Sequence, residues 1–134
     1  MNKTPIPFAT TAEHVGVLRS VNGNLPHIHQ RMVSHKRALA KILSMGMAKR
    51  HRANPLASLR AECIFAAPVL YSGIASLLIS KSESDILSSH VKETFSRLLK
   101  LHPKTPSPVV FFLAGRLPGE AQLHQKQLML FGMI

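Results

Sequence analysis

The sequence predicts a mainly α-helical fold, a multi-helix bundle of four to five helices preceded by a short β-strand or half-hairpin. Apolar residues recur at helical spacing through several stretches, and cap residues, Pro or Gly mark the ends of those stretches. The 134 residues are 46% apolar, enough for one folded core. We expect an extended lead-in and a last strand over residues 1–23, and one helical domain over residues 24–134.

The first expected elements are a strand and a long basic helix. Residues 14–18 form a short apolar run suited to a strand or half a hairpin, and residues 21–24 form a turn. Asn24 is a candidate N-cap and Gly46 a candidate stop for the helix that follows. Its apolar residues fall within an arc of about 100°: Ile28, Met32, Leu39, Ile42 and Leu43.

The next helix is predicted to start at Asn54 and Pro55, a cap followed by Pro in the first turn. Pro68 lies inside the pattern and predicts a kink or two helices end to end. One apolar face is expected to run along this rod and to consist of Leu56, Leu59, Cys63, Ala67, Leu70, Ile74 and Leu78.

Three further helices are expected. Ser82 and Asp85 have the spacing of a capping box, and the helix that they open is predicted to stop at His102 and Pro103. A short helix is expected over residues 109–113, with Gly115 ending it. The last helix is predicted over residues 118–130.

Positive charge is concentrated in the first half of the helical region. The chain carries 17 Lys plus Arg against six Asp plus Glu, a formal charge of +11. Nine of the basic residues lie between His14 and Ala61, where there is no acid at all. Most charge runs are solvated helix faces, but those usually mix both signs. The pattern therefore favours a polyanionic partner, bound through the backbone of a duplex because Trp is absent.

Catalytic and metal chemistry find little support in the sequence. Asp85 is the one Asp, and the five Glu are scattered, so no carboxylate cluster for phosphoryl transfer is expected. His27 and His29 would point about 200° apart on a helix, and we expect them to face solvent or phosphate. His35 lies within the apolar arc and is expected to be a hydrogen-bonded histidine at the edge of the core. We predict no metal and no cofactor.

A membrane partner is not expected either. Residues 63–80 carry no charge, but Tyr71, Ser72, Gly73 and Ser76 interrupt them and their apolar residues are patterned, which favours a helix buried in protein. The single Cys63 forms no internal disulfide, and the first residues lack a signal-peptide pattern. These features predict an intracellular protein, nuclear or cytoplasmic.

Several short motifs, taken in order, resemble one family. Residues 14–17 resemble a Leu-Gly-Val hairpin strand, and Pro26-His27-Ile28 resembles the His-Ile opening of a basic amphipathic helix. Residues 67–73 resemble a Leu-Pro-x-Leu-x-Tyr-Gly helix, and residues 101–106 with 115–120 resemble a Thr-Pro and Gly-x-Leu-Pro-x-Glu sequence. In this order they resemble the thumb and post-thumb region of reverse transcriptases of LINE-type, non-long-terminal-repeat retrotransposons.

The resemblance implies a positional function. Thumb helices of such polymerases hold the primer-template duplex, RNA–DNA hybrid or DNA, against the palm. The Tyr-x-Asp-Asp motif and the fingers are absent, so no activity is expected from this chain alone, and the palm of a longer polyprotein would be a partner. The expected phosphate contacts are Arg31, Lys36, Arg37, Lys41, Lys49, Arg50 and Arg52.

Three alternatives stay open. The chain could be a free-standing basic helical module of the helix-turn-helix kind, although residues 46–54 are long for its turn. It could associate with a membrane through residues 63–80. It could also be a retrotransposon relic whose apolar palm-facing surface is left bare.

Overall fold

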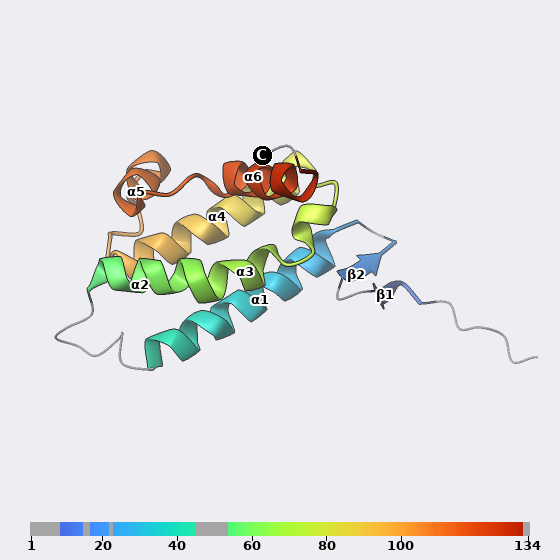
Figure 1. Ribbon diagram of the computed structural model, residues 1–134, viewed down its shortest axis with the longest axis horizontal. Helices are drawn as coiled ribbons and strands as arrows, with labels where there is room; N and C mark the ends of the chain where they lie inside the picture. The colour runs from blue at the N-terminus through green and yellow to red at the C-terminus, as the bar shows by residue number, and fades with distance from the viewer. Residues whose placement is uncertain (1–8, 15–16, 22, 45–53, 133–134) are drawn as a thin grey trace, which may run out of the picture.

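The computed structural model describes residues 9–14, 17–21, 23–44 and 54–132. A two-stranded hairpin precedes a bundle of helices, which confirms the predicted mainly-α class (Figure 1). The elements are β1 (Thr11–His14), β2 (Val17–Ser20), α1 (Leu25–Ile42), α2 (Pro55–Ala61), the π-helix η2 (Glu62–Ala66), α3 (Ala67–Tyr71), the 3-10 helix η3 (Ile74–Ser76), α4 (Lys81–Leu98), α5 (Ser107–Ala114) and α6 (Gly119–Leu130).

The hairpin includes the strand or half-hairpin expected over residues 14–18 and begins earlier, at Thr11. β1 and β2 pair antiparallel, with Thr11 opposite Ser20 and His14 opposite Val17, so that stretch contributes to both strands. Val15 and Gly16 lie outside the described residues. The turn predicted after the hairpin is present: Gly23 has a φ of +106° and forms an isolated bridge with Ser20.

A buried histidine holds the hairpin to the helices. The Leu18 N–H donates to Nδ1 of His27 over 3.1 Å, which leaves Nε2 as the protonated nitrogen facing the Ser72 carbonyl at 3.3 Å. Gly73, with a φ of +77°, closes against the same ring, and a Cβ there would lie 2.9 Å from Cγ2 of Val17. Burial lowers the pKa of His27, although the Ser72 contact opposes it. The prediction that His27 faces solvent is therefore wrong, whereas His29 is exposed.

Helix α1 begins where the sequence predicts, but its cap is not the one expected. The Asn24 side chain makes no capping bond and instead donates to the Leu78 carbonyl over 2.6 Å. The Asn24 N–H donates to Glu83 Oε1 over 3.2 Å. The start of α1 is thereby tied to the start of α4. Gly46, the expected stop, lies outside the described residues.

The rod from α2 to α3 confirms the predicted start and the predicted break. Asn54 Oδ1 accepts from the Leu56 N–H over 3.0 Å, a true N-cap. Pro68 has no N–H to donate, and the turn just before it is widened into the π-helix η2. The rod ends at Tyr71, so the apolar face does not continue to Leu78, which is 95% exposed.

The residues that face inward along the rod differ from those predicted. The positions buried along the rod include Leu59, Glu62, Ala66 and Leu70, whereas the predicted Cys63 is only half-buried. Leu56, expected on the buried face, is 68% exposed. A glutamate has therefore taken the core-facing position that helical spacing assigned to a cysteine.

Helix α4 starts two residues earlier than predicted. Its capping box pairs Ser80 with Glu83: the Glu83 N–H donates to Ser80 Oγ, and the Ser80 N–H donates to Glu83 Oε2 over 2.9 Å. Burial alone would raise the pKa of Glu83, but bonds from the Ser80 and Asn24 N–H groups lower it. The predicted box of Ser82 and Asp85 is wrong, and α4 ends at Leu98, before His102.

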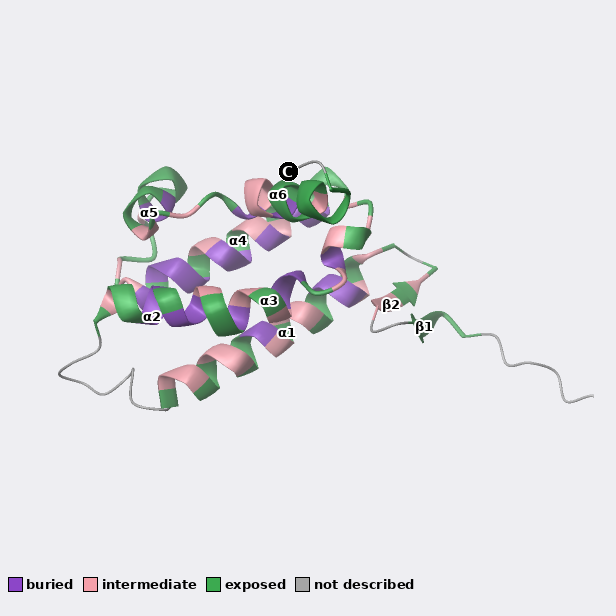
Figure 2. Ribbon diagram, in the orientation of Figure 1, coloured by how far each residue is buried: buried purple, intermediate pink, exposed green. Residues whose placement is uncertain are grey.

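The core lies where α4 meets the other helices (Figure 2). Phe95 on α4 packs edge to face against Phe111 on α5, with ring centroids 5.9 Å apart. α5 and α6 agree with the predicted last two helices, and Gly115 caps α5 with a φ of +64°. Fully buried core side chains from these and the earlier helices are Ile28, Leu70, Ile74, Leu87, Val110 and Leu123.

No helix among the described residues is both long and apolar enough to cross a membrane. The uncharged stretch over residues 63–80, which was considered as a membrane-associated segment, is divided among η2, α3 and η3.

The two candidate caps of α4 can be separated by substitution. We expect Ser80→Ala to lower the free energy of unfolding by about 1 kcal/mol, because a bonded N-cap is lost. Ser82→Ala, its matched control, removes only the exposed contact of Ser82 Oγ with Ser80 Oγ and should lower the free energy of unfolding by less than about 0.5 kcal/mol. Urea unfolding at one pH measures both, and a larger loss for Ser82→Ala would contradict the assignment.

Candidate nucleic-acid interface

The side of α1 that faces solvent carries positive charge and no negative charge. Lys36, Arg37 and Lys41 are exposed and lie within six successive residues, so they span about 7.5 Å along the helix at 1.5 Å per residue. α1 contains neither Asp nor Glu, and its other exposed residues are uncharged apart from the titratable His29. The result is a strip of cations, here called the α1 cationic face: Lys36, Arg37 and Lys41.

The remaining predicted contacts do not all join this strip. Arg31 lies on the flank of α1, partly buried, and its charge helps to lower the pKa of His27 after the larger effect of burial. Lys49, Arg50 and Arg52 lie outside the described residues. The α1 cationic face thus holds three of the seven residues that the sequence predicted.

The opposite side of α1 joins a buried row of hydrogen bonds. Nδ1 of His35 lies 2.9 Å from Nε2 of His90 on α4, and Nε2 of His35 lies 3.1 Å from Glu62 Oε1 in η2. The three residues are 1%, 3% and 5% exposed. If Glu62 is ionised, His35 donates through Nε2 and accepts at Nδ1 from a neutral His90. Both hydrogen bonds then have one donor and one acceptor, and the row carries a single negative charge, on Glu62.

Electrostatics around this row keep His90 neutral. Burial lowers the pKa of His90 to about 4, and the neighbouring His35, Lys36 and Arg97 lower this pKa further. On the other side of the row, burial and the charge of Glu62 both raise the pKa of the Tyr71 hydroxyl. The row therefore ends at α4 in an uncharged histidine, His90, which lines the same groove as Lys36.

The geometry of the row is that of a hydrogen-bonded chain. Its ring nitrogens point at one another across 2.9 Å, so they do not converge on a shared point. Within the described ranges, no group of three or more His, Cys, Asp or Glu side chains is arranged to hold a metal ion. The expectation that His35 is a hydrogen-bonded histidine is confirmed, and it lies deeper than the core edge.

The sequence left Glu62 and His90 unassigned. A usable signal was present, because His90 follows Leu87 by three residues and so falls on the apolar side of α4. Glu62 follows Leu59 by three residues and precedes Ala66 by four, so it also has helical spacing, but a carboxylate gives no apolar signal that would place it on a buried face.

No protein-family model, curated protein or solved structure matches this chain.

The neutral state of His90 predicts how stability depends on pH. Unfolded His90 takes up a proton near pH 6.5, whereas folded His90 does so only near pH 4. Between these values the unfolded state binds more protons, so the free energy of unfolding should fall as pH falls. At about 1.4 kcal/mol per pKa unit, the titration of His90 should lower the free energy of unfolding by roughly 3 kcal/mol over this range. Urea unfolding between pH 7 and pH 4 measures it.

The matched variant is His90→Gln, which keeps a donor for His35 but does not titrate. It should be less stable than the wild type at pH 7 and lose less stability on acidification. His27 also has a lowered pKa and contributes in the same direction in both proteins, so the difference between the two curves isolates His90. Identical pH dependence in the two would contradict a neutral, buried His90.

Proposed function

We propose that this chain is a non-catalytic, thumb-like module that holds a nucleic-acid duplex, either RNA–DNA hybrid or DNA, through its phosphate backbone. The observation that carries the proposal is the α1 cationic face, where Lys36, Arg37 and Lys41 are exposed on a helix without a carboxylate. The order of motifs resembling a reverse transcriptase thumb supports the same reading.

Backbone contact suits this face better than reading of bases. Lys and Arg side chains that neutralise phosphates release counterions, which favours binding to any sequence. Stacking on bases relies mostly on Phe, Tyr and Trp side chains, and α1 contains none of these. The large exposed aromatics Phe65, Phe112 and Phe131 belong to other elements. The bound duplex is therefore held without selection of its sequence.

The proposal includes three further residues and a cellular setting. Lys49, Arg50 and Arg52 follow α1 in the chain, and we include them as phosphate contacts because their charges continue the acid-free stretch. Arg31 is included as a contact at the flank of α1. A nucleic-acid partner implies an intracellular protein, nuclear or cytoplasmic.

The second proposed partner is the palm of a longer polyprotein. All four residues of β1 are exposed, and β1 pairs only with β2 in the described sheet, so its other edge is open for pairing. An added palm strand would complete a sheet on that edge.

A free-standing helix-turn-helix module is the less supported alternative. Residues 46–54, which would have to form the turn, are nine residues long. The turn of that motif has about three or four. Such a module would select among sequences, whereas a thumb would bind duplexes of equal length and different sequence alike.

The experiment measures how binding depends on salt. We expect Arg37→Ala with Lys41→Ala to weaken binding of a short RNA–DNA hybrid and to flatten the slope of log affinity against log salt by about two units. Each lost phosphate contact reduces the magnitude of this slope by about 0.9. Fluorescence anisotropy over a series of salt concentrations gives the slope.

The matched control carries the same loss of charge at exposed lysines away from α1, Lys104→Ala with Lys126→Ala. It should leave the slope within about half a unit of the wild type, because neither residue touches a phosphate in the proposed mode. Equal flattening in the two double variants would mean that net charge alone attracts the duplex, and would remove the α1 cationic face from the interface.

A further inference from the structure

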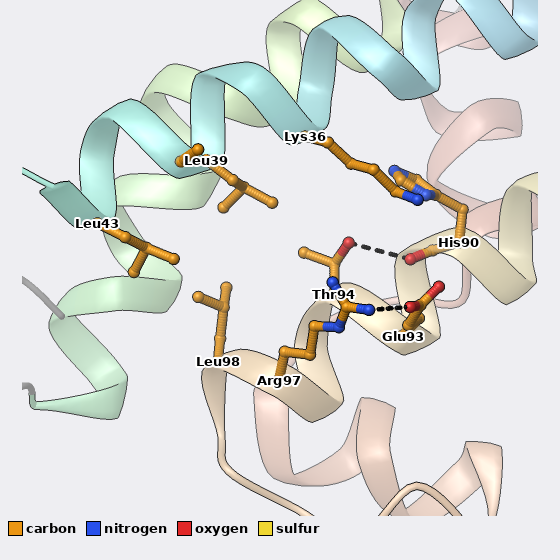
Figure 3. A pocket seen from close by; sticks show the side chains of 9 residues that line it. Lys36, Leu39, Leu43, His90, Glu93, Thr94, Arg97 and Leu98 are labelled. Atoms are coloured by element: carbon orange, nitrogen blue, oxygen red, sulfur yellow. Dashed lines mark hydrogen bonds and ion pairs between the residues drawn. The ribbon is translucent and has the colours of Figure 1, made fainter.

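A groove of about 210 Å³ lies between α1 and the second half of α4 (Figure 3). It is open to solvent along one side of the bundle and separate from the outer side of α1, where Arg37 and Lys41 lie. The side chains that matter for the argument are Lys36, Leu39, Leu43, His90, Arg97 and Leu98.

The two ends of the groove differ in chemistry. Figure 3 shows Leu39, Leu43 and Leu98 gathered at one end. Toward the other end lie Lys36, His90, and Arg97 with its partner Glu93. Leu39 and Leu43 are only partly buried against the core, so the apolar end retains accessible surface. The groove is thus amphipathic along its length, and a ligand that fits it must be amphipathic in the same order.

The polar end carries net positive charge. Lys36 is exposed and has no hydrogen bond or ion pair within the described part of the chain. Arg97 pairs with Glu93, which cancels one of the two positive charges. The Thr94 hydroxyl donates to the His90 carbonyl over 3.0 Å and is not a free donor. The cation left to bind a ligand is therefore Lys36.

We propose that this groove binds a small amphipathic carboxylate, with its acyl chain against Leu39, Leu43 and Leu98 and its carboxylate on Lys36. The acyl chain of the ligand would remove apolar surface from water. Its carboxylate would pair with Lys36, which has no other ion-pair partner among the described residues. The volume of about 210 Å³ is below the range of roughly 300–1,000 Å³ typical for larger ligands, which limits the chain to a short or medium length.

Other occupants fit the groove less well. A cationic amphiphile would place its charge beside Lys36, which repels it, and the carboxylate that lines the groove, Glu93, is already paired with Arg97. A backbone phosphate satisfies Lys36 but offers nothing apolar to the leucine end. The assignment does not rest on nucleic-acid binding and can hold or fail independently of it.

The test uses octanoate and follows the methyl groups of Leu39, Leu43 and Leu98 by NMR of the full chain. Octanoate should shift these methyl signals saturably. Acetate, which lacks the acyl chain, should leave these signals unchanged, and octylammonium, which carries the opposite charge, should shift them less than octanoate at the same concentrations. Absence of a saturable response to octanoate, or an equal response to octylammonium, would overturn the proposal.

Variants then separate the role of Lys36 from general charge. Lys36→Ala should weaken octanoate binding by about two- to fivefold, the range of an exposed ion pair, and Lys36→Arg should restore most of it. Arg37→Ala removes the neighbouring charge on the solvent side of α1 and should leave octanoate binding unaltered. Equal affinity for the wild type and Lys36→Ala would exclude Lys36 as the carboxylate contact and overturn the assignment.

Discussion

Three helical elements meet at the buried row of hydrogen bonds that runs from Glu62 through His35 to His90, and their orientation depends on it. A buried carboxylate without partners costs several kcal/mol, so η2 must present Glu62 to a donor, and His35 is that donor. His35 then needs a donor for its second nitrogen, which α4 supplies through His90. The rotation of α1 about its own axis is set by this requirement as much as by its leucines.

The orientation of α1 determines both proposed binding surfaces. With His35 directed inward, Arg37 and Lys41 lie on the solvent side, where a duplex could reach them. Lys36 lies between the two sides and reaches over the groove toward His90 (Figure 3). The row and the charges therefore belong to the same helix, because His35, Arg37 and Lys41 all lie on α1.

Local pattern identified the helices but could not choose between similar signals. Ser80 with Glu83 and Ser82 with Asp85 have the same spacing, and both precede the same apolar run. Glu83 prevails because its carboxylate also accepts the N–H of Asn24, a residue 59 positions earlier in the chain. In the same way, His27 looked like a solvent-facing histidine because its two partners, Leu18 and Ser72, come from segments that helical periodicity does not relate to it.

The sequence by itself determined the mainly-α class, the start of the second helix at Asn54 and Pro55, the break at Pro68, and which side of α1 carries Arg37 and Lys41. These features follow from contacts within one turn of a helix or from the period of apolar residues. The tertiary structure decided that Glu62 replaces Cys63 on the inner face, that His27 clamps the hairpin, and that Lys36 and Arg97 approach the same groove. Each of these joins residues from separate elements, so its free energy depends on packing that no local pattern contains.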